Sequence, residues 1–476
     1  MFQIVYFDSI KQKNTMTRKD RRSFIKKLAG SGVAALSVPA LLEARPERTE
    51  MMLPRKYSVS ANEKIRLGMV GMGIMGYNNA QSALKIPGVE LAGVCDLYQG
   101  RLDSSRENFG KDIFVTKDYK ELINKSDIDA ICVSTSDHWH DRITIEALKA
   151  GKTVYCEKPM MHRIEEGKAM LDAEQSSGKV LQVGSQRVSS IMIEKAAEIY
   201  RSGAIGELVM VETYNDRFSR LGAWQYSIPT DASAKTVDWK GFLGDAPKQD
   251  FDAKRFFRWR NYQDYGTGVA GDLFVHLFSG LHTTIGSLGP NRIYATGGLR
   301  YWEDGRDVPD VMLAVVDYPD AKNHPAFNLQ IRVNFVASGG GGSIQQFVGT
   351  EGTMEIGWGD IKVRKNKIPN APGYGGWDSY ETFSAAQKKD YELWYQSTYP
   401  ENYQMKEPSE LVYRVPEGYS DHLDHWTNFI EATRSGGKVV EDAAFGIRAA
   451  APSLATNLSL FENRIINWDP ANMKLG

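Results

Sequence analysis

Three ionisable side chains stand in patterns that suit proton transfer to or from a hydroxyl group. Asp272 and His276 are four positions apart, so on a helix their side chains lie on one face and can reach a common point. Lys158 follows an apolar run and stands between Glu157 and Pro159. An imidazole can accept a hydroxyl proton, and an ammonium can stabilise the oxygen that is left. The alternative for His276 is a core histidine hydrogen-bonded to Asp272.

A glycine-rich turn offers a place for a second reactant. The apolar run 65–70 predicts a strand, and residues 75–85 predict a helix. Gly71 permits a tight turn, Gly73 lets backbone N–H groups approach a pyrophosphate, and Gly76 lets the helix pack close to the strand. The pattern predicts a dinucleotide site formed by Gly71, Gly73, Ile74, Met75 and Gly76.

Asp96 indicates which dinucleotide binds. The apolar run 89–95 ends at Asp96, twenty residues after Gly76. A carboxylate at this point can accept both ribose hydroxyls of the adenosine half, and it repels the additional phosphate of NADP. The alternative is a loop aspartate that caps the next helix. Because the glycine turn precedes it, Asp96 favours NAD as the cofactor.

Further apolar runs extend the pattern of alternating strands and helices. The runs 129–135, 153–156 and 179–184 predict strands, and 142–149 predicts a helix between the first two. This alternation is typical of a doubly wound parallel sheet, in which ligands bind outside the carboxyl ends of the strands. Candidate cofactor contacts there are Ser134, Thr135, Ser136, Trp139, His140, Glu157, Lys158 and Gln186. The alternative for each is ordinary loop packing.

The composition limits the classes of partner. A chain of 476 residues exceeds one ordinary core and predicts at least two domains. With 58 basic and 59 acidic residues the formal charge is -1, which gives no electrostatic case for nucleic acid or an anionic membrane. Small, weakly charged partners fit better, and no metal site is expected. Cys95, Cys132 and Cys156 lie in or near apolar runs and are expected to be buried free thiols.

The N-terminal segment has the pattern of an export signal. Arg21 and Arg22 precede Ser-Phe-Ile-Lys, and residues 28–42 are largely apolar. This run is shorter than the roughly 20 residues that a membrane-spanning helix needs. The arginine pair is typical of the twin-arginine signal, which carries folded proteins; the alternative is a basic amphipathic helix. We expect a signal peptide at 1–44, a linker or surface arm at 45–62, a periplasmic location reached through the twin-arginine export machinery, and a tightly bound cofactor.

The order and spacing of six motifs resemble one known family, the Gfo/Idh/MocA oxidoreductases. The motifs are the glycine turn at 71–76, the segment 129–140, Glu157-Lys158-Pro159, the run 182–186, the pair Asp272 and His276, and the segment 349–353. The resemblance implies an α/β fold: a Rossmann domain at 63–187, then a substrate-binding domain at 188–476 with an open, mostly antiparallel sheet. The face of that sheet often serves for oligomerisation, so a homo-oligomer is expected.

The resemblance also implies roles for the ionisable residues. Lys158, Asp272 and His276 then line the substrate site, with His276 as the preferred base and Lys158 polarising the reacting oxygen. Lys158 as the base is an alternative, because a lysine brought near a nicotinamide can lose its proton more readily and act as a base. Asp272 either binds a substrate hydroxyl or orients the imidazole. His140 and Glu157 are expected under the nicotinamide ribose and Trp139 beside the ring, and the Lys158–Pro159 bond is expected to be cis.

The stretch 217–268 is rich in aromatic and basic residues, a composition that suits sugars, although the aromatic side chains could instead form a core between the domains. We expect Arg187, Arg260 and Tyr262 to contact the substrate. Residues 339–342 are four glycines and predict a loop between strands, while 366–409 predicts a long surface excursion.

These patterns together favour an NAD-dependent oxidoreductase that acts on a hydroxyl of a sugar, polyol or glycoside. One alternative is a glycosidase that oxidises C3 transiently with NAD and then eliminates the leaving group. The histidine-interrupted glycine motif of such glycosidases is not found, because Ser343 follows the glycines. Another alternative is a cofactor-binding sensor without catalysis.

Overall fold

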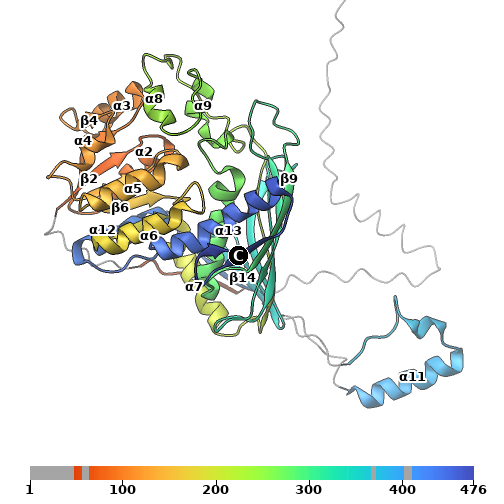
Figure 1. Ribbon diagram of the computed structural model, residues 1–476. Helices are drawn as coiled ribbons and strands as arrows, with labels where there is room; N and C mark the ends of the chain where they lie inside the picture. The colour runs from red at the N-terminus through yellow and green to blue at the C-terminus, as the bar shows by residue number, and fades with distance from the viewer. Residues whose placement is uncertain (1–47, 56–63, 340, 366–370, 401–409) are drawn as a thin grey trace, which may run out of the picture. The chain divides into compact units, whose positions relative to one another are not determined.

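The computed structural model describes residues 48–55, 64–339, 341–365, 371–400 and 410–476 (Figure 1). The expected signal peptide lies outside this range, and so do residues 45–47 and 56–62 of the expected arm. Within the described residues the chain forms two sheets, one of six strands and one of eleven. No helix in the described ranges is long and apolar enough to cross a membrane.

The six-stranded sheet is wholly parallel, and its strands are buried apolar runs covered by helices on both faces. In spatial order the strands are β4 (Phe114–Thr116), β3 (Val89–Cys95), β2 (Ile65–Val70), β5 (Ala130–Val133), β6 (Thr153–Glu157) and β7 (Leu181–Gly184). Its helices are α2 (Ile74–Ala83), α3 (Gln99–Phe109), α4 (Tyr119–Ile123), α5 (His140–Lys149) and α6 (Glu166–Ser177). The strand order reverses between β2 and β5, and a ligand crevice is expected outside their carboxyl ends.

The second sheet is larger and mostly antiparallel. In spatial order its strands are β1 (Arg48–Met51), β15 (Glu410–Arg414), β14 (Asp360–Lys365), β13 (Gly352–Ile356), β12 (Gly341–Gly349), β8 (Leu208–Arg217), β11 (Phe327–Asn334), β10 (Val311–Tyr318), β9 (Arg292–Gly298), β16 (Ile466–Asp469) and β17 (Lys474–Leu475). Among the described strands of this larger sheet, only the pairs β1–β15 and β8–β11 are parallel. The expected fold class is therefore confirmed.

Helices cover one face of the large sheet and leave the other open. Along β10, Met312, Ala314 and Val316 are buried while Leu313 and Val315 are exposed, as a strand with one solvent face requires. The covering helices are α7 (Ile191–Arg201), α10 (Val275–Ile285) and α13 (Ala443–Glu462), which pack on one another and on the sheet (Figure 1). The expected buried free thiols, Cys95, Cys132 and Cys156, lie in the strands of the parallel sheet.

The helix α12 (Asp421–Ser435) returns from the C-terminal half of the chain to the N-terminal sheet. It packs against α2. Its residue Trp426 is fully buried and stacks on Tyr155 with 4.3 Å between ring centroids. The Trp426 indole N–H donates to Asn79 Oδ1 at 3.1 Å. The parallel sheet thus depends on a helix that follows it in the sequence by more than two hundred residues.

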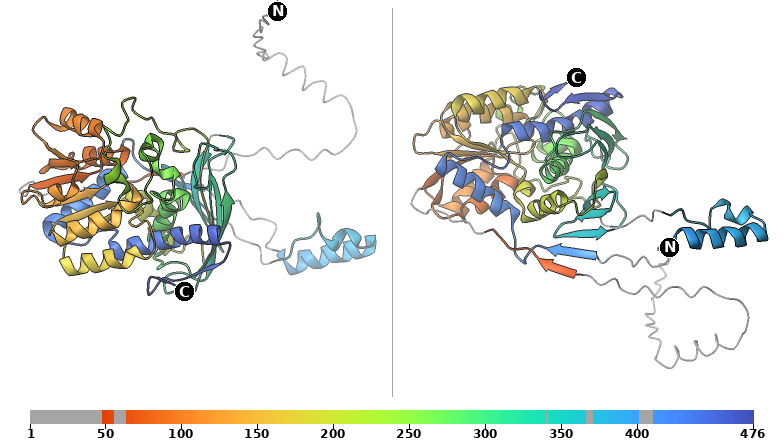
Figure 2. Two further views of the ribbon diagram at one scale, coloured as in Figure 1. Left: turned by 45° about the horizontal axis from the view of Figure 1, so that its top comes forward. Right: turned by 90° about the horizontal axis from the view of Figure 1, so that it is seen from below.

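Three segments differ from the sequence expectation or add to it. The expectation of a loop at 339–342 is wrong for Gly341 and Gly342, because β12 begins at Gly341, which pairs with Arg217 of β8. Gly341 has a φ of 82°, and a Cβ there would lie 2.2 Å from the Asp216 carbonyl oxygen, so only glycine fits this close strand approach. Within the expected arm, residues 48–51 form strand β1 beside β15 (Figure 2). Within the expected excursion, Ala385–Thr398 form helix α11.

Replacing Trp426 by Ala is expected to lower the free energy of unfolding by about 3–5 kcal/mol, because it empties a buried site between α12 and the parallel sheet. Urea denaturation measures this change. Trp377→Ala is the matched control: Trp377 is 107% exposed, and a loss within about 0.5 kcal/mol is expected there. Equal losses in the two variants would contradict the packing role of α12.

Candidate active site

A cavity of about 430 Å³ lies at the carboxyl ends of the parallel strands. Its walls come from the turn after β2, the ends of β3, β5 and β6, and the segment 226–260 of the second domain. Of the predicted cofactor residues, the lining includes Gly71, Gly73, Ile74, Met75, Asp96, Ser134, Thr135, Ser136, Trp139, His140, Glu157 and Lys158. Gly76 and Gln186, which were also predicted to contact the cofactor, are absent from the lining.

The glycine turn has the geometry that a pyrophosphate requires. Gly73 is the N-cap of α2 and no side chain caps the helix, so N–H groups of the first turn are open to a ligand. A Cβ on Gly76 would lie 1.9 Å from the carbonyl oxygen of Gly71. Gly76 therefore lets α2 begin directly on the turn. These observations fit NAD, whose diphosphate the turn would hold.

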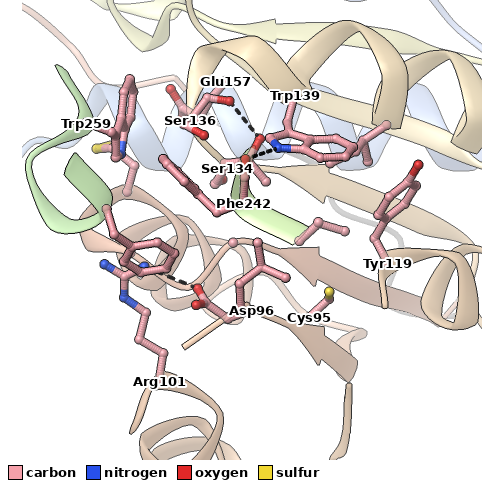
Figure 3. Close-up of a pocket in the computed structure, with 18 of the residues that line it drawn as sticks. Cys95, Asp96, Arg101, Tyr119, Ser134, Ser136, Trp139, Glu157, Phe242 and Trp259 are labelled. Atoms are coloured by element: carbon pink, nitrogen blue, oxygen red, sulfur yellow. Dashed lines mark hydrogen bonds and ion pairs between the residues drawn. The ribbon is translucent and has the colours of Figure 1, made fainter. Parts of the chain in front are cut away.

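Asp96 lies at the end of β3 and is 4% exposed. Its carboxylate accepts hydrogen bonds from the backbone N–H groups of Met72 at 2.7 Å and Tyr98 at 2.9 Å. Arg101 of α3 approaches it at 3.4 Å, as Figure 3 shows. The backbone contacts fix the carboxylate at the cavity wall, where the expected ribose contact requires it. Sequence reasoning missed Arg101, because no motif marks a residue near the start of the helix that follows Asp96.

Glu157 is held in place by amide side chains. Its Oε1 accepts from Asn79 at 2.8 Å and from Gln186 at 2.9 Å. Gln186 was expected to contact the cofactor; instead it lies behind Glu157 and is absent from the cavity lining. Gln186 begins a short 3₁₀ helix after β7, and its side-chain amide is bound to Glu157. The Lys158–Pro159 bond is cis, as expected.

The side chains after β5 anchor neighbouring segments as well as lining the cavity. His140 Nδ1 lies 2.7 Å from the Pro159 carbonyl oxygen and thereby holds the turn that carries Lys158. The Trp139 indole N–H donates to the carbonyl oxygen of Phe242 at 2.9 Å (Figure 3). Trp139 and His140 therefore fix the positions of both cavity walls.

Lys158 and Asp272 form a buried ion pair between the two domains. The Lys158 ammonium donates to the Asp272 carboxylate and to its backbone carbonyl oxygen, both at 2.8 Å. Arg260 donates to the same carboxylate oxygen at 3.1 Å. Burial raises the pKa of Asp272, but the charges of Lys158 and Arg260 outweigh it and hold the pKa well below its usual range. Asp272 is therefore an anion that holds two cations.

His276 does not pair with Asp272, contrary to the expectation that Asp272 orients the imidazole. The described residues offer no hydrogen-bond partner to its buried Nδ1. Residues Ala270–Phe274 form a π-helical turn, which alters the angular relation between positions four apart. Burial, followed by the positive charge of Lys158, keeps the pKa of His276 well below its usual range. The imidazole is neutral at pH 7 and can accept a proton.

The aromatic stretch 217–268 is mostly a core of its own. Its cluster contains Val237, Phe242, Leu243, Phe256, Phe257, Tyr262 and Tyr265 together with Tyr98 of the Rossmann domain. Tyr262 was expected to contact substrate; its ring packs under Arg255 and is absent from the cavity lining. Phe242, Phe256, Phe257 and Trp259 line the cavity instead. The sequence alone could not show which aromatic side chains are buried in this core and which of them line the cavity.

Backbone pairing ties this segment to the Rossmann domain beside Asp96. Gln99 N–H donates to the Thr236 carbonyl oxygen at 2.9 Å, and Asp238 N–H donates to that of Leu97 at 2.8 Å. The Tyr98 hydroxyl donates to Asp231 at 2.6 Å. Residues 231–257 therefore form a wall over the side of the cavity where the adenosine ribose is expected. No group of three or more possible metal ligands occurs in the described part of the chain.

Known proteins share this architecture. Residues 65–185 match the family described as "Oxidoreductase family, NAD-binding Rossmann fold". Inositol 2-dehydrogenase of Salmonella typhimurium is 31% identical over 149 residues, which is 31% of this chain and 44% of the relative. Alpha-N-acetylgalactosaminidase of Shewanella oneidensis is 26% identical over 191 residues, 38% of this chain and 40% of the relative. The chain thus matches less than half the length of either curated relative.

A solved structure extends the likeness to the second domain at the level of fold. Levoglucosan dehydrogenase in complex with NADH and levoglucosan superposes with a TM-score of 0.60 at 18% identity, covering 85% of this chain and 99% of that one. The motif order, the parallel sheet and the family match at residues 65–185 agree. Residues 65–185 are thus similar to the NAD-binding Rossmann domain of the Gfo/Idh/MocA oxidoreductases, and the rest of the chain shares their fold.

Proposed function

We propose that the protein is an NAD-dependent oxidoreductase that transfers hydride between the cofactor and a hydroxyl-bearing carbon of a sugar, polyol or glycoside. The observation that carries this proposal is a charged group that reaches the cavity through Lys158 and Arg260, while Asp272 and His276 are absent from the cavity lining. Lys158 lines the cavity wall and forms an ion pair with Asp272. The positive charge of Lys158 also helps to keep His276 neutral. The Salmonella relative is an inositol dehydrogenase, and the superposed structure contains NADH and levoglucosan. Both names support a polyhydroxylated substrate.

The residues divide the proton chemistry between them. NAD, when bound, accepts or supplies the hydride. An ammonium has three N–H donors, and Asp272 takes two of those of Lys158. The third is left for the substrate oxygen, whose developing charge it stabilises. His276 accepts the hydroxyl proton, while Asp272 acts as a positioning residue for Lys158 and Arg260. The ion pair with Asp272 stabilises Lys158 as a cation. The neutral imidazole of His276 is then the proposed base.

We also propose that the protein binds NAD tightly and that it is exported. The wall 231–257 supports cofactor retention, because its backbone pairing at 97–99 would have to open before the cofactor could leave. The arginine pair at 21–22 supports twin-arginine export to the periplasm. Changing both arginines to Lys is expected to abolish export, which cell fractionation measures. Appearance of the variant in the periplasm would refute the assignment.

A homo-oligomer is supported by the open face of the large sheet. Leu313 and Val315 of β10 are exposed there, and Tyr294 of β9 pairs with Val315. A contiguous exposed apolar surface of this kind often serves association. Light scattering of the purified protein measures the mass, and a monomer at micromolar concentration would oppose this assignment.

The second candidate function is NAD-dependent glycoside cleavage, which the Shewanella relative favours by its name. Both activities use the same cofactor and a base, so the site alone allows either. Aryl glycosides distinguish them. Release of the aglycone without net formation of NADH would indicate glycosidase action, whereas NADH formation with an intact glycoside would indicate simple oxidation.

His276→Asn is expected to lower turnover by about 10²–10⁴-fold, because it removes the base, while the amount of bound NAD stays unchanged. The wild-type pH profile should show no loss from His276 as the pH falls from 7 to the ordinary histidine value of about 6.5. Its lowered pKa keeps the imidazole neutral there, and activity declines only at lower pH.

Lys158→Arg separates the two possible roles of Lys158. Arginine keeps a positive charge but cannot lose a proton in a protein. If Lys158 acts as a cation, Lys158→Arg should retain more activity than Lys158→Ala, measured as NADH formation at 340 nm. Equal inactivity of the two, with near-normal turnover in His276→Asn, would make Lys158 the base.

Gly73→Ala is expected to weaken NAD binding at least about tenfold, which equals about 1.4 kcal/mol, while the thermal midpoint stays unchanged. The reason is that an added Cβ meets only the Arg101 guanidinium, at 3.6 Å, and points into the lined cavity. In Gly76→Ala the added Cβ clashes with the backbone, so this variant should lower both the affinity for NAD and the thermal midpoint. Calorimetric titration with NAD and thermal melting measure these effects. Undiminished NAD binding by Gly73→Ala would contradict the placement of the diphosphate.

A further inference from the structure

The region around Asp272 and His276, which we call the substrate end of the site, contains more cationic side chains than carboxylates that form ion pairs with them. Four cationic side chains act electrostatically on Asp272, on His276 or on both: Lys158, Arg187, Arg217 and Arg260. Asp272 is the one carboxylate within 4 Å of any of them among the described residues. It pairs with Lys158 and Arg260 through a single oxygen atom, Oδ1. Arg187 and Arg217 therefore have no carboxylate of their own.

Arg187 lies in the short helix η2 (Gln186–Ser189), which packs against α10 and hence beside His276. One guanidinium nitrogen donates to the Gly357 carbonyl oxygen at 3.1 Å, and the group lies 5.2 Å from the ring centre of Trp358. Burial lowers the pKa of Arg187, and Asp421 opposes this from beyond ion-pair distance. The side chain is fixed by neutral groups, which leaves most of its N–H donors unused.

Arg217 is the last residue of strand β8. Its guanidinium lies 6.0 Å from the ring centre of Phe335, which follows β11, and β11 contacts the π-helical turn that carries Asp272. Its contacts are the Asn215 side-chain oxygen and the Gly222 carbonyl oxygen, both at 3.4 Å. These are long, neutral hydrogen bonds. Arg217 is therefore held near Asp272 without a compensating charge.

The NAD diphosphate does not account for these two charges. Its place is the turn at 71–76, and neither Arg187 nor Arg217 lines the cavity there. A partly buried cation without a counter-ion is costly. Guanidinium groups bind carboxylate, sulfate and phosphate oxygens in a fork geometry that neutral hydroxyls do not match. A substrate that carries such a group would satisfy both arginines.

We propose that the substrate is an anionic carbohydrate, whose carboxylate, sulfate or phosphate group binds Arg187 and Arg217 while a ring hydroxyl faces Lys158 and His276. This inference rests on the proposed oxidoreductase function for the reacting hydroxyl, but the anion site is a separate claim. The exposed indole of Trp358 beside Arg187 adds a ring on which a sugar can stack.

The test compares matched neutral and anionic sugars on the NAD-loaded protein. The probes are glucose, galactose and mannose, their uronates, and their 6-sulfates and 6-phosphates, so that the three anionic groups are distinguished. Calorimetry measures affinity and absorbance at 340 nm measures NADH. At least one anionic sugar is expected to bind about tenfold or more tightly than its neutral parent, as charge-assisted hydrogen bonds allow, and higher salt should weaken it.

Variants assign the effect to the two arginines. Arg187→Gln and Arg217→Gln should each remove the preference for the anionic sugar, and Arg217→Lys should keep part of it. Arg220→Gln is the matched control: Arg220 is exposed and contacts Gln225, so the preference should persist. Thermal melting of each variant shows that it is folded; if Arg217→Gln does not fold, Arg217→Lys and Arg187→Gln carry the test.

The outcomes separate this inference from the proposed function. Equal or tighter binding of every neutral parent overturns the anion site, and so does the absence of binding by all the anionic probes, even if a neutral sugar is oxidised. Arginine-dependent binding of an anionic sugar without NADH formation supports the anion site and removes the proposed hydride transfer from that sugar. Binding and NADH formation together support both.

Discussion

The buried ion pair between Lys158 and Asp272 is the contact on which the site depends. Lys158 follows the last residue of β6 in the Rossmann domain, whereas Asp272 lies in the π-helical turn before α10 in the second domain. Breaking such a pair strands a charge away from water and is strongly unfavourable. The pair therefore sets the distance between the cofactor wall and the substrate residues. Arg260 reinforces it by binding the same carboxylate oxygen.

The C-terminal part of the chain supports this contact from behind. Trp426 of α12 donates to Asn79, Asn79 donates to Glu157, and Gln186 donates to the same Glu157 oxygen. Glu157 is the residue before Lys158, so this buried network fixes the backbone from which the ammonium extends. Removing one partner from such a network leaves polar groups unsatisfied. The two domains are consequently parts of one site, although their sheets are separate.

Features that depend on neighbours in the sequence could be predicted, and those that depend on distant segments could not. The glycine turn, Asp96 and the parallel strands follow from local spacing, and the structure has them at those residues. The relation between Asp272 and His276 was predicted from α-helical spacing, but the π-helical turn changes it. Tyr262 and Phe257 look alike in sequence, yet only Phe257 reaches the cavity. Arg101 and Arg217 gain their places from tertiary contacts and belong to no motif.

The local charge of the site differs from the net charge of the whole chain. The formal charge of -1 gave no reason to expect a charged ligand, because it averages over a surface where acidic and basic groups alternate. At the substrate end, one carboxylate faces two cations, and two further guanidiniums are fixed by carbonyl and amide oxygens. The Rossmann domain supplies the cofactor turn and Lys158. The short helix that joins the domains supplies Arg187, and the second domain supplies Arg217, Arg260 and His276. The three arginines that we propose to bind substrate, Arg187, Arg217 and Arg260, consequently lie beyond residues 65–185, which the family match covers.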